Sequence, residues 1–309
     1  MKVSFRRMML SIVIFLVQVI SACASPPQRP AATQTLAVQA PAAQPSATSI
    51  PQAQSETFPK VTIPGSIVRQ LHSSATGRDY DIYVRLPEVY ARYKMKKYPV
   101  LYVLDGQWDF KLLDSIYGGL LYDRFVPEMI IVGITYSGKA PDYETLRAMD
   151  YTPVADSYLP GSGDAAKFFT FLKEQLMPFI ESNYRADPAQ RVLMGSSFGG
   201  TFTLYALFSE PSLFSGYVAA SPAVVYGNGF AFKQEAEYAS DHKDLPVRLF
   251  LSVGEIEDLA EPVQQFMQVL SERNYTGLEL ETRIIEGERH AGNKPEAYNR
   301  GLRFIFQDK

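Results

Sequence analysis

Gly195-Ser196-Ser197-Phe198-Gly199 fits the pattern Gly-x-Ser-x-Gly, with Ser197 at its centre. This pattern is typical of a nucleophile elbow, a sharp turn from a strand into a helix that lifts the serine hydroxyl clear of the backbone. The flanking glycines are needed because larger side chains would collide in so tight a turn. The apolar run 191–194 before the motif predicts a buried strand, and 201–208 after it predicts an amphipathic helix. Ser197 is therefore the candidate nucleophile, whereas Ser196 is out of frame and is interpreted as a turn residue.

A serine hydroxyl is a weak nucleophile, so it needs a neighbouring histidine as its base, and that histidine is in turn oriented by a carboxylate. On folds with this elbow, the chain order is nucleophile, acid, histidine. The chain has three histidines, and only His290 lies in a loop after a late predicted strand. His72 lies upstream of the elbow and His242 lies in a polar run, so both are predicted to be solvated. His290 is the candidate base.

Three carboxylates compete for the role of the acid. The predicted strand 247–253 leads directly into Gly254-Glu255-Ile256-Glu257-Asp258. Glu257 and Asp258 lie deeper in this loop than Glu255, where a side chain can turn toward a histidine. We predict Glu257 as the acid, with Asp258 as the alternative. Each of them is also compatible with a charge at the start of the following helix, which the helix dipole favours.

The oxyanion of a tetrahedral intermediate needs two backbone N–H donors. The residue after the nucleophile, Phe198, supplies the first. The second is expected from the loop after an early strand, and 98–104 leads into Asp105-Gly106-Gln107-Trp108. Gly106 would let the backbone turn the next amide inward, which makes Gln107 N–H the second candidate donor. A simple Asp-Gly turn is the alternative interpretation.

Apolar runs with strand character alternate with helical patterns from residue 80 onward, which predicts an α/β fold. Strands are predicted over 80–85, 98–104, 129–135, 191–194, 216–220, 247–253 and 278–285. Helices are predicted over 110–122, 165–182, 199–208, 262–273 and 295–306, with Asp164 as the N-cap of the second.

The first 23 residues have the pattern of a targeting signal. Lys2, Arg6 and Arg7 precede an apolar segment, 8–20, that is short for a membrane span. The segment ends in Ile20-Ser21-Ala22-Cys23, which resembles the lipobox of bacterial lipoproteins, in which the cysteine is lipidated. Cys23 is the only cysteine, so no intramolecular disulfide or thiolate metal cluster is expected. An ordinary secretory signal is the alternative.

Residues 24–57 are predicted to form a disordered tether, because 24–54 consist almost entirely of Ala, Pro, Gln, Ser and Thr. The remaining 58–309 suit a single catalytic domain. The formal charge of the chain is −3, and removal of the three cations near the N-terminus takes it to −6. An acidic chain without long Lys/Arg runs is a poor candidate for nucleic-acid binding, so no nucleic-acid partner is expected.

With these residues placed, the chain resembles the putative-esterase family of α/β-hydrolases over about 62–306, nearest to its siderophore trilactone esterase branch. The resemblance rests on the elbow, on Val103-Leu-Asp-Gly-Gln-Trp108, and on three further segments: Arg147-Ala-Met-Asp-Tyr-Thr-Pro153, Gly161-Ser-Gly-Asp-Ala-Ala-Lys-Phe168 and Ala219-Ala-Ser-Pro222. It implies an α/β-hydrolase fold, with a mostly parallel central sheet and helices on both faces. It also implies that Trp108, Arg147 and Tyr226 border a substrate cleft. The chain departs from the branch at Ser196 and at Val224-Val225-Tyr226, which leaves the substrate open.

The sequence thus predicts a serine carboxylic-ester hydrolase that acts through an acyl-enzyme and needs no metal or cofactor. The resemblance implies a siderophore ester as substrate, with feruloyl or acetyl esters on polysaccharide, or acyl transfer, as alternatives. A surface binding module that has lost the chemistry is the rival from another class. Cys23 predicts a lipid anchor in the cell envelope. Because Ala24 rather than aspartate follows it, the outer membrane is expected if the cell has two membranes.

Overall fold

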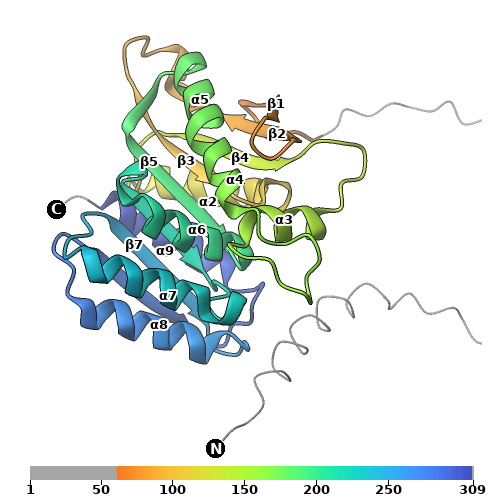
Figure 1. Cartoon of the computed structure of the whole chain (residues 1–309). Helices are drawn as coiled ribbons and strands as arrows, with labels where there is room; N and C mark the ends of the chain where they lie inside the picture. The colour runs from red at the N-terminus through yellow and green to blue at the C-terminus, as the bar shows by residue number, and fades with distance from the viewer. Residues whose placement is uncertain (1–60, 308–309) are drawn as a thin grey trace, which may run out of the picture. The chain divides into compact units, whose positions relative to one another are not determined.

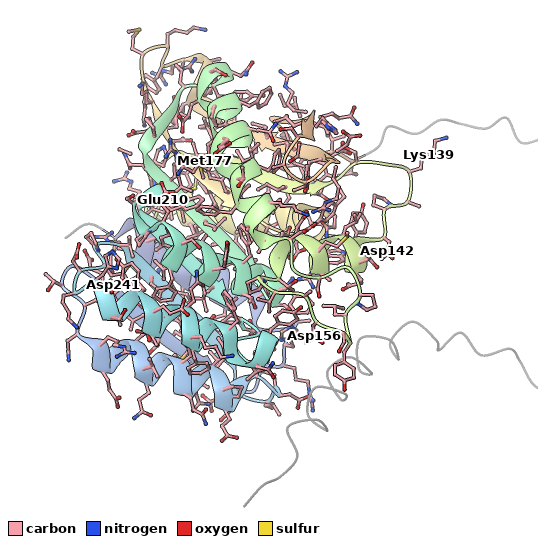
Figure 2. All side chains as sticks on the ribbon, viewed as in Figure 1. Lys139, Asp142, Asp156, Met177, Glu210 and Asp241 are labelled. Carbon is pink, nitrogen blue, oxygen red and sulfur yellow. The ribbon has the colours of Figure 1, made fainter. Side chains whose placement is uncertain are left out.

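The computed structural model describes residues 61–307 of the chain (Figure 1). The predicted signal peptide, the predicted tether and Cys23 lie outside the described residues. Figure 2 shows the side chains on the same view, with Asp142 just before helix α3 (Tyr143–Tyr151) and Asp156 in the loop that follows that helix.

The central feature is an eight-stranded sheet with the order β1-β2-β4-β3-β5-β6-β7-β8. Strands β1 and β2 pair in antiparallel fashion with their neighbours, whereas β4, β3, β5, β6, β7 and β8 are parallel. The mostly parallel sheet predicted from the sequence is confirmed. The strands are β1 Ser66–Ser73, β2 Arg78–Arg85, β3 Tyr98–Val103, β4 Ile130–Tyr136, β5 Ala186–Ser196, β6 Gly216–Ala220, β7 Arg248–Gly254 and β8 Glu279–Ile285.

Helices cover both faces of the sheet, as predicted (Figure 1). Helices α2 and α9 pack together on one face, and α5, α6 and α8 lie on the other, with α3 and α7 packed on α6. The helices are α2 Gly106–Tyr122, α3 Tyr143–Tyr151, α4 Ala165–Phe171, α5 Met177–Asn183, α6 Phe198–Ser209, α7 Tyr226–Asp241, α8 Ala260–Arg273 and α9 Lys294–Phe306.

The core between the sheet and the α2–α9 layer consists of apolar residues that recur at regular spacing along the helices and strands. Helix α2 buries residues at helical spacing, and the parallel strands contribute every second residue to the same face. This dense packing fixes both helices against the sheet, so the loops that precede them are held in place. The cluster includes Leu101, Val103, Phe110, Leu113, Tyr117, Val192, Met194, Tyr298, Leu302 and Ile305.

Several predicted boundaries were wrong. The elbow strand begins at Ala186 rather than at 191, and α2 begins at Gly106 rather than at 110. The predicted helix 165–182 is α4, a π-helical turn Leu172–Leu176, and α5, in direct succession. The Asp164 side chain makes no capping hydrogen bond, because its carboxylate pairs with Lys167 and Arg78 instead.

One strand, two α-helices and the short 3-10 helices Glu88–Ala91 and Pro211–Leu213 were missed altogether. Strand β1 is an edge strand with mostly exposed side chains, so it lacks a strong apolar signal. Helix α3 buries polar and charged residues, so its apolar pattern is weak. Helix α7 begins with a kink at 227–229, where three residues have positive φ, and this segment has no regular helical pattern.

The sheet topology collects the candidate residues at one edge. Strands β3, β5, β6, β7 and β8 are parallel, so their carboxyl ends meet at the same edge of the sheet. Gln107 lies in the first turn of α2, directly after β3, and the turn after β5 carries Ser197. The loops after β7 and β8 carry Glu257 and His290. Residues far apart in the sequence are thereby brought to one place.

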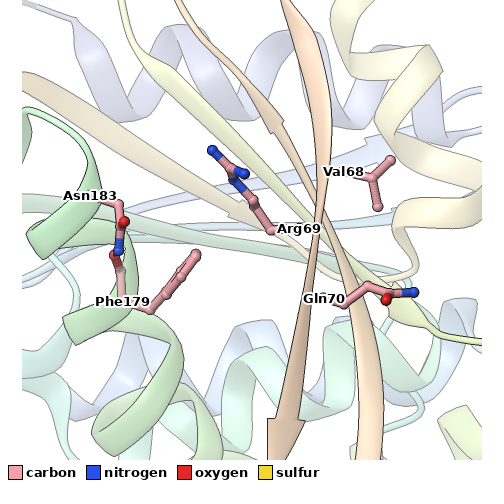
Figure 3. Close-up of a pocket in the computed structure, with 5 residues that line it drawn as sticks. All are labelled: Val68, Arg69, Gln70, Phe179 and Asn183. Atoms are coloured by element: carbon pink, nitrogen blue, oxygen red, sulfur yellow. The ribbon is translucent and has the colours of Figure 1, made fainter.

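A groove between β1 and α5 is separate from this edge. It is lined by Val68, Arg69 and Gln70 on the strand and by Phe179 and Asn183 on the helix (Figure 3). None of these residues belongs to a loop at the carboxyl ends of the parallel strands.

Within residues 61–307, no helix is long and apolar enough to cross a membrane, and no cluster of three or more His, Cys, Asp or Glu side chains is arranged to hold a metal ion.

Candidate active site

Ser197 occupies a strained turn between β5 and α6. Its φ of 59° and ψ of −124° lie outside the regions that L-residues normally adopt. Its amide donates to Ala220 O at 3.0 Å and its carbonyl accepts from Thr201 N at 2.9 Å, which fixes the turn. A Cβ on Gly195 would lie 2.5 Å from the carbonyl of Gly199, so a glycine is required there. Ser197 remains partly exposed, as a nucleophile elbow requires.

His290 and Glu257 are in direct contact. His290 Nδ1 lies 2.5 Å from Glu257 Oε2, and the Glu257 side chain is 3% exposed against 42% for His290. This arrangement makes Nδ1 the protonated nitrogen and leaves Nε2 for a second partner. Asp258 is exposed, and Glu255 is exposed with Oε2 accepting from Gly287 N at 2.8 Å. Of the three candidate carboxylates, the structure brings only Glu257 to His290.

Three donors hold the second oxygen of Glu257. Oε1 accepts from Ser221 Oγ at 2.6 Å, from Gly254 N at 2.5 Å and from Asn293 Nδ2 at 3.2 Å. Asn293 Nδ2 also lies 2.9 Å from Ser221 Oγ, and both residues are fully buried. The sequence interpretation used Ser221 only as part of the segment Ala219-Ala-Ser-Pro222 that carries the family resemblance, and it missed Asn293. A serine immediately after β6 was the one available signal.

The two candidate oxyanion donors lie at helix N-termini. Gln107 and Phe198 are in the first turns of α2 and α6, and within the described part of the chain neither amide donates a hydrogen bond to another protein group. The first amides of a helix have no intrahelical acceptor, so they are available to an anion. Both amides belong to turns at the carboxyl edge of neighbouring strands, β3 and β5.

The turn before α2 differs in one respect from the prediction. The left-handed residue is Asp105, with φ 54°, and not Gly106. Gly106 is a glycine because a Cβ there would lie 2.9 Å from the backbone of Gly133. The Asp105 carboxylate receives both Nε and Nη2 of Arg147, at 2.9 and 2.8 Å, and the Asp105 amide donates to Tyr151 Oη at 3.1 Å. Helix α3 therefore anchors the turn.

The three predicted cleft residues lie around one aromatic cluster. Trp108 is 38% exposed, and the guanidinium of Arg147 lies 5.6 Å from its ring and 5.4 Å from that of Phe198. Tyr226 is buried, packs edge-on against Phe198 and donates to Val154 O at 2.8 Å. Arg147 is 5% exposed and its charge is paired with Asp105. Trp108 is thus the most accessible of the three.

A second buried ion pair joins the two sides of the site. The Asp109 carboxylate, on α2, contacts Lys294 Nζ at 2.9 Å and Tyr298 Oη at 2.5 Å, both on α9. Burial raises the pKa of Asp109, and the neighbouring Lys294 charge opposes this effect. This contact links the helix that presents Gln107 to the helix that follows His290.

The other two histidines lie apart from the site, as predicted. His72 is exposed on β1 and pairs with Asp79, and His242 is exposed and stacks on Tyr238.

A strained serine elbow, with a histidine and a carboxylate on two later loops of a mostly parallel sheet, defines a serine hydrolase of the α/β-hydrolase type. Comparison with known proteins narrows the class. The sequence model of the family described as "Putative esterase" matches residues 73–293. The chain belongs to this family, and the protein is an ester hydrolase.

Relatives of this chain align with it over more than half of its residues. The chain is 32% identical over 268 residues to the ferri-bacillibactin esterase BesA of Bacillus subtilis. The aligned segment covers 79% of this chain and 91% of that protein. The chain is 31% identical over 188 residues to the apo-salmochelin esterase of Escherichia coli, covering 56% of each. Among solved structures, the BES protein of Bacillus cereus matches with a TM-score of 0.73 and 27% identity, covering 82% of this chain and 100% of that one.

Proposed function

We propose that Ser197, His290 and Glu257 form the catalytic triad of this esterase. One observation carries the assignment: His290 Nδ1 lies 2.5 Å from Glu257 Oε2, on loops at the same sheet edge as the Ser197 elbow. In the first half-reaction, Ser197 Oγ bonds to the ester carbonyl carbon while His290 Nε2 takes its proton. The C–O bond to the alcohol then breaks, and His290 returns the proton to the leaving alkoxide.

The backbone amides of Gln107 and Phe198 stabilise the oxyanion that forms in this step. Their lack of protein acceptors in the described structure supports this role. In the second half-reaction, water gives a proton to His290 and attacks the acyl carbon. The acyl–Oγ bond then breaks and Ser197 recovers its proton, so the net reaction is hydrolysis without a cofactor. Glu257 orients the imidazole and stabilises its charged form throughout.

The substrate proposed is the lactone backbone of a catecholate siderophore. Support comes from the relative described as a ferri-bacillibactin esterase, which the chain matches over most of its length. The partly exposed indole of Trp108 and the ring of Phe198 offer aromatic faces next to the elbow on which catechol rings can stack.

A hydrolysis panel tests this proposal. The purified protein is assayed on a catecholate trilactone with and without Fe³⁺, on a feruloyl ester, on acetylated polysaccharide and on p-nitrophenyl esters, with Ser197→Ala as the blank. We expect the highest kcat/KM on the trilactone. A feruloyl or acetyl ester preferred by tenfold or more would transfer the assignment to polysaccharide esters, and acyl transfer to an added sugar would show the alternative chemistry.

We also propose that Cys23 carries lipid and anchors the enzyme in the cell envelope, in the outer membrane if the cell has two. The support is the Ile20-Ser21-Ala22-Cys23 segment after a short apolar run. Mass spectrometry of the mature N-terminus should show a diacylglyceryl-modified Cys23, and Cys23→Ala should remove the protein from the membrane fraction. An unmodified cysteine, or cleavage at another site, would contradict the anchor.

A further inference from the structure

The serine that follows β6 and the asparagine that precedes α9 have no part in the triad itself, yet both contact its acid. Ser221 Oγ donates to Glu257 Oε1 at 2.6 Å, and Asn293 Nδ2 lies within hydrogen-bond distance of both Ser221 Oγ and Glu257 Oε1. Ser221 and Asn293 each lie 36 positions away from Glu257 in the sequence. Each group is fully buried, so water does not compete for these bonds.

The backbone at Ser221 is held in an unusual conformation that directs its hydroxyl. Its φ of 43° is left-handed, and its amide donates to Ser252 O at 2.7 Å, which extends the β6–β7 pairing by one bond. A left-handed serine costs conformational energy and persists only where the surroundings impose it. Here the conformation places Oγ against the carboxylate of Glu257.

Asn293 ties the same carboxylate to the histidine loop. Its Nδ2 also lies 3.1 Å from Arg289 O and 3.0 Å from His290 O. One amide group therefore contacts the backbone that carries the base and the side chain of the acid. Movement of the His290 loop away from Glu257 would break these bonds together.

We infer that Ser221 and Asn293 are positioning residues, which fix the rotamer of Glu257 so that Oε2 faces His290 Nδ1. The inference rests on the proposed triad. Because Oε1 is held by Ser221, Asn293 and the Gly254 amide, only Oε2 is left for the imidazole. Without these donors, Glu257 has other rotamers available and the imidazole loses its fixed orientation.

The test is a double-mutant cycle on p-nitrophenyl acetate with the full-length protein. Ser221→Ala and Asn293→Ala should each lower kcat about tenfold with KM changed less than about twofold, because the loss falls on the orientation of the base. In a Glu257→Gln background, the same substitutions should change kcat less than about twofold, since the residue through which they act is already gone.

Two further variants separate hydroxyl loss from backbone damage. Ser221→Gly suits the left-handed φ and keeps the turn, so it should show the same kcat loss as Ser221→Ala with an unchanged melting temperature. Ser252→Ala is the matched control, because Ser252 is equally buried and its hydroxyl has no partner within the described residues. It should leave kcat within twofold of the wild type.

The outcomes distinguish this inference from the triad assignment. If Glu257→Gln keeps near wild-type turnover, the proposed acid is wrong and the positioning role is overturned with it. If Glu257→Gln is crippled while Ser221→Gly and Asn293→Ala stay within twofold of wild type, the triad stands and the positioning role is overturned. Equal losses in both backgrounds would show that the two residues act independently of Glu257, and would also overturn it.

Discussion

Ser197 is the residue whose loss should be most costly, because no other partly exposed hydroxyl occupies the elbow. Ser197→Ala keeps the Cβ and therefore the backbone turn, so the variant should fold with the wild-type melting temperature. We expect kcat to fall by roughly 10⁴-fold or more, as for other serine hydrolases that lose the nucleophile. Steady-state hydrolysis of p-nitrophenyl acetate measures the loss.

Ser196→Ala is the matched control for this prediction. Ser196 is buried next to the nucleophile and its hydroxyl has no partner within the described residues. Its removal should change kcat by less than about threefold, since no hydrogen bond is broken. Comparable turnover by the Ser197→Ala variant would reject the assignment of the nucleophile.

The three carboxylates after β7 give a second prediction at the residue scale. Glu257→Gln should lower kcat by roughly 10⁴-fold, because a misoriented imidazole costs about that much in a triad. Asp258→Asn and Glu255→Gln remove exposed charges and should change kcat by less than about tenfold. If Asp258→Asn alone gave the large loss, the acid would be one position further along. If none of the three did, the enzyme would work with a Ser197–His290 dyad.

The same residues show how far sequence reasoning reaches. The frame of the elbow and the chain order identified Ser197 and His290 as candidates, and depth in the loop favoured Glu257 over Glu255. The contacts of Asn293 were out of reach, because they depend on where the loops after β7 and β8 meet. No spacing rule within one segment reports such an encounter.

At the scale of elements, apolar strands and amphipathic helices were predictable and polar ones were not. Strands β3 to β7 have runs of buried apolar residues, and α2, α8 and α9 bury apolar residues at helical spacing. Strand β8 buries only Ile285, and α6 is buried on almost every face instead of being amphipathic as predicted, because it lies under α3 and α7. Helix α3 lacks this signal because it buries Arg147 and Asp150, whose partners come from other elements. An element stabilised by ion pairs is recognisable only once its partners are known.

Helix α3 supports a prediction of its own. Arg147→Lys keeps the charge but cannot make the bidentate contact with Asp105, so the left-handed turn before Gln107 should loosen. We expect kcat to fall about tenfold with little change in KM on p-nitrophenyl acetate, because the oxyanion donor is misplaced. Arg300→Lys, at an exposed pair with Glu296 on α9, is the matched control and should have no effect.

If the effect of Arg147→Lys fell on KM instead of on kcat, we would assign a different role to Arg147. An unchanged kcat with a KM raised on the catecholate trilactone, but not on p-nitrophenyl acetate, would show that Arg147 contacts the substrate directly. That result would favour the cleft role implied by the family resemblance over an anchoring role for the Asp105 turn.

In the molecule as a whole, buried polar contacts join elements that are far apart in the sequence. Asp109 links α2 to α9, and Asp150 links α3 to β2 through Arg78 and Tyr80. Asp105 and Arg147 join the end of β3 to α3. The Asp105 and Asp109 pairs connect the segment that presents Gln107 to α3 and α9, so the site geometry depends on contacts outside the site. Breaking one such pair leaves an uncompensated buried charge, which is strongly destabilising.

The contribution of the buried Asp150 to the free energy of unfolding depends on pH. Burial raises its pKa to about 6, and the attraction of Arg78 offsets only part of that effect. An unfolded chain returns the carboxyl to a pKa of about 3.9. Between about pH 4 and pH 6 the folded state therefore binds more protons than the unfolded state. The contribution of Asp150 to the free energy of unfolding is complete below pH 4 and is lost as the pH rises through 6.

We therefore expect the free energy of unfolding of the wild type, relative to Asp150→Asn, to fall by up to about 3 kcal/mol between pH 4 and pH 6 and then to level off. Urea denaturation at several pH values measures the difference. Asp142→Asn is the control, because hydrogen bonds from Thr145 lower the pKa of that exposed carboxyl, so its stabilisation is lost only as the pH falls below about 4. A wild-type and Asp150→Asn difference that rises with pH over this window would mean that the Arg78 ion pair outweighs burial at Asp150.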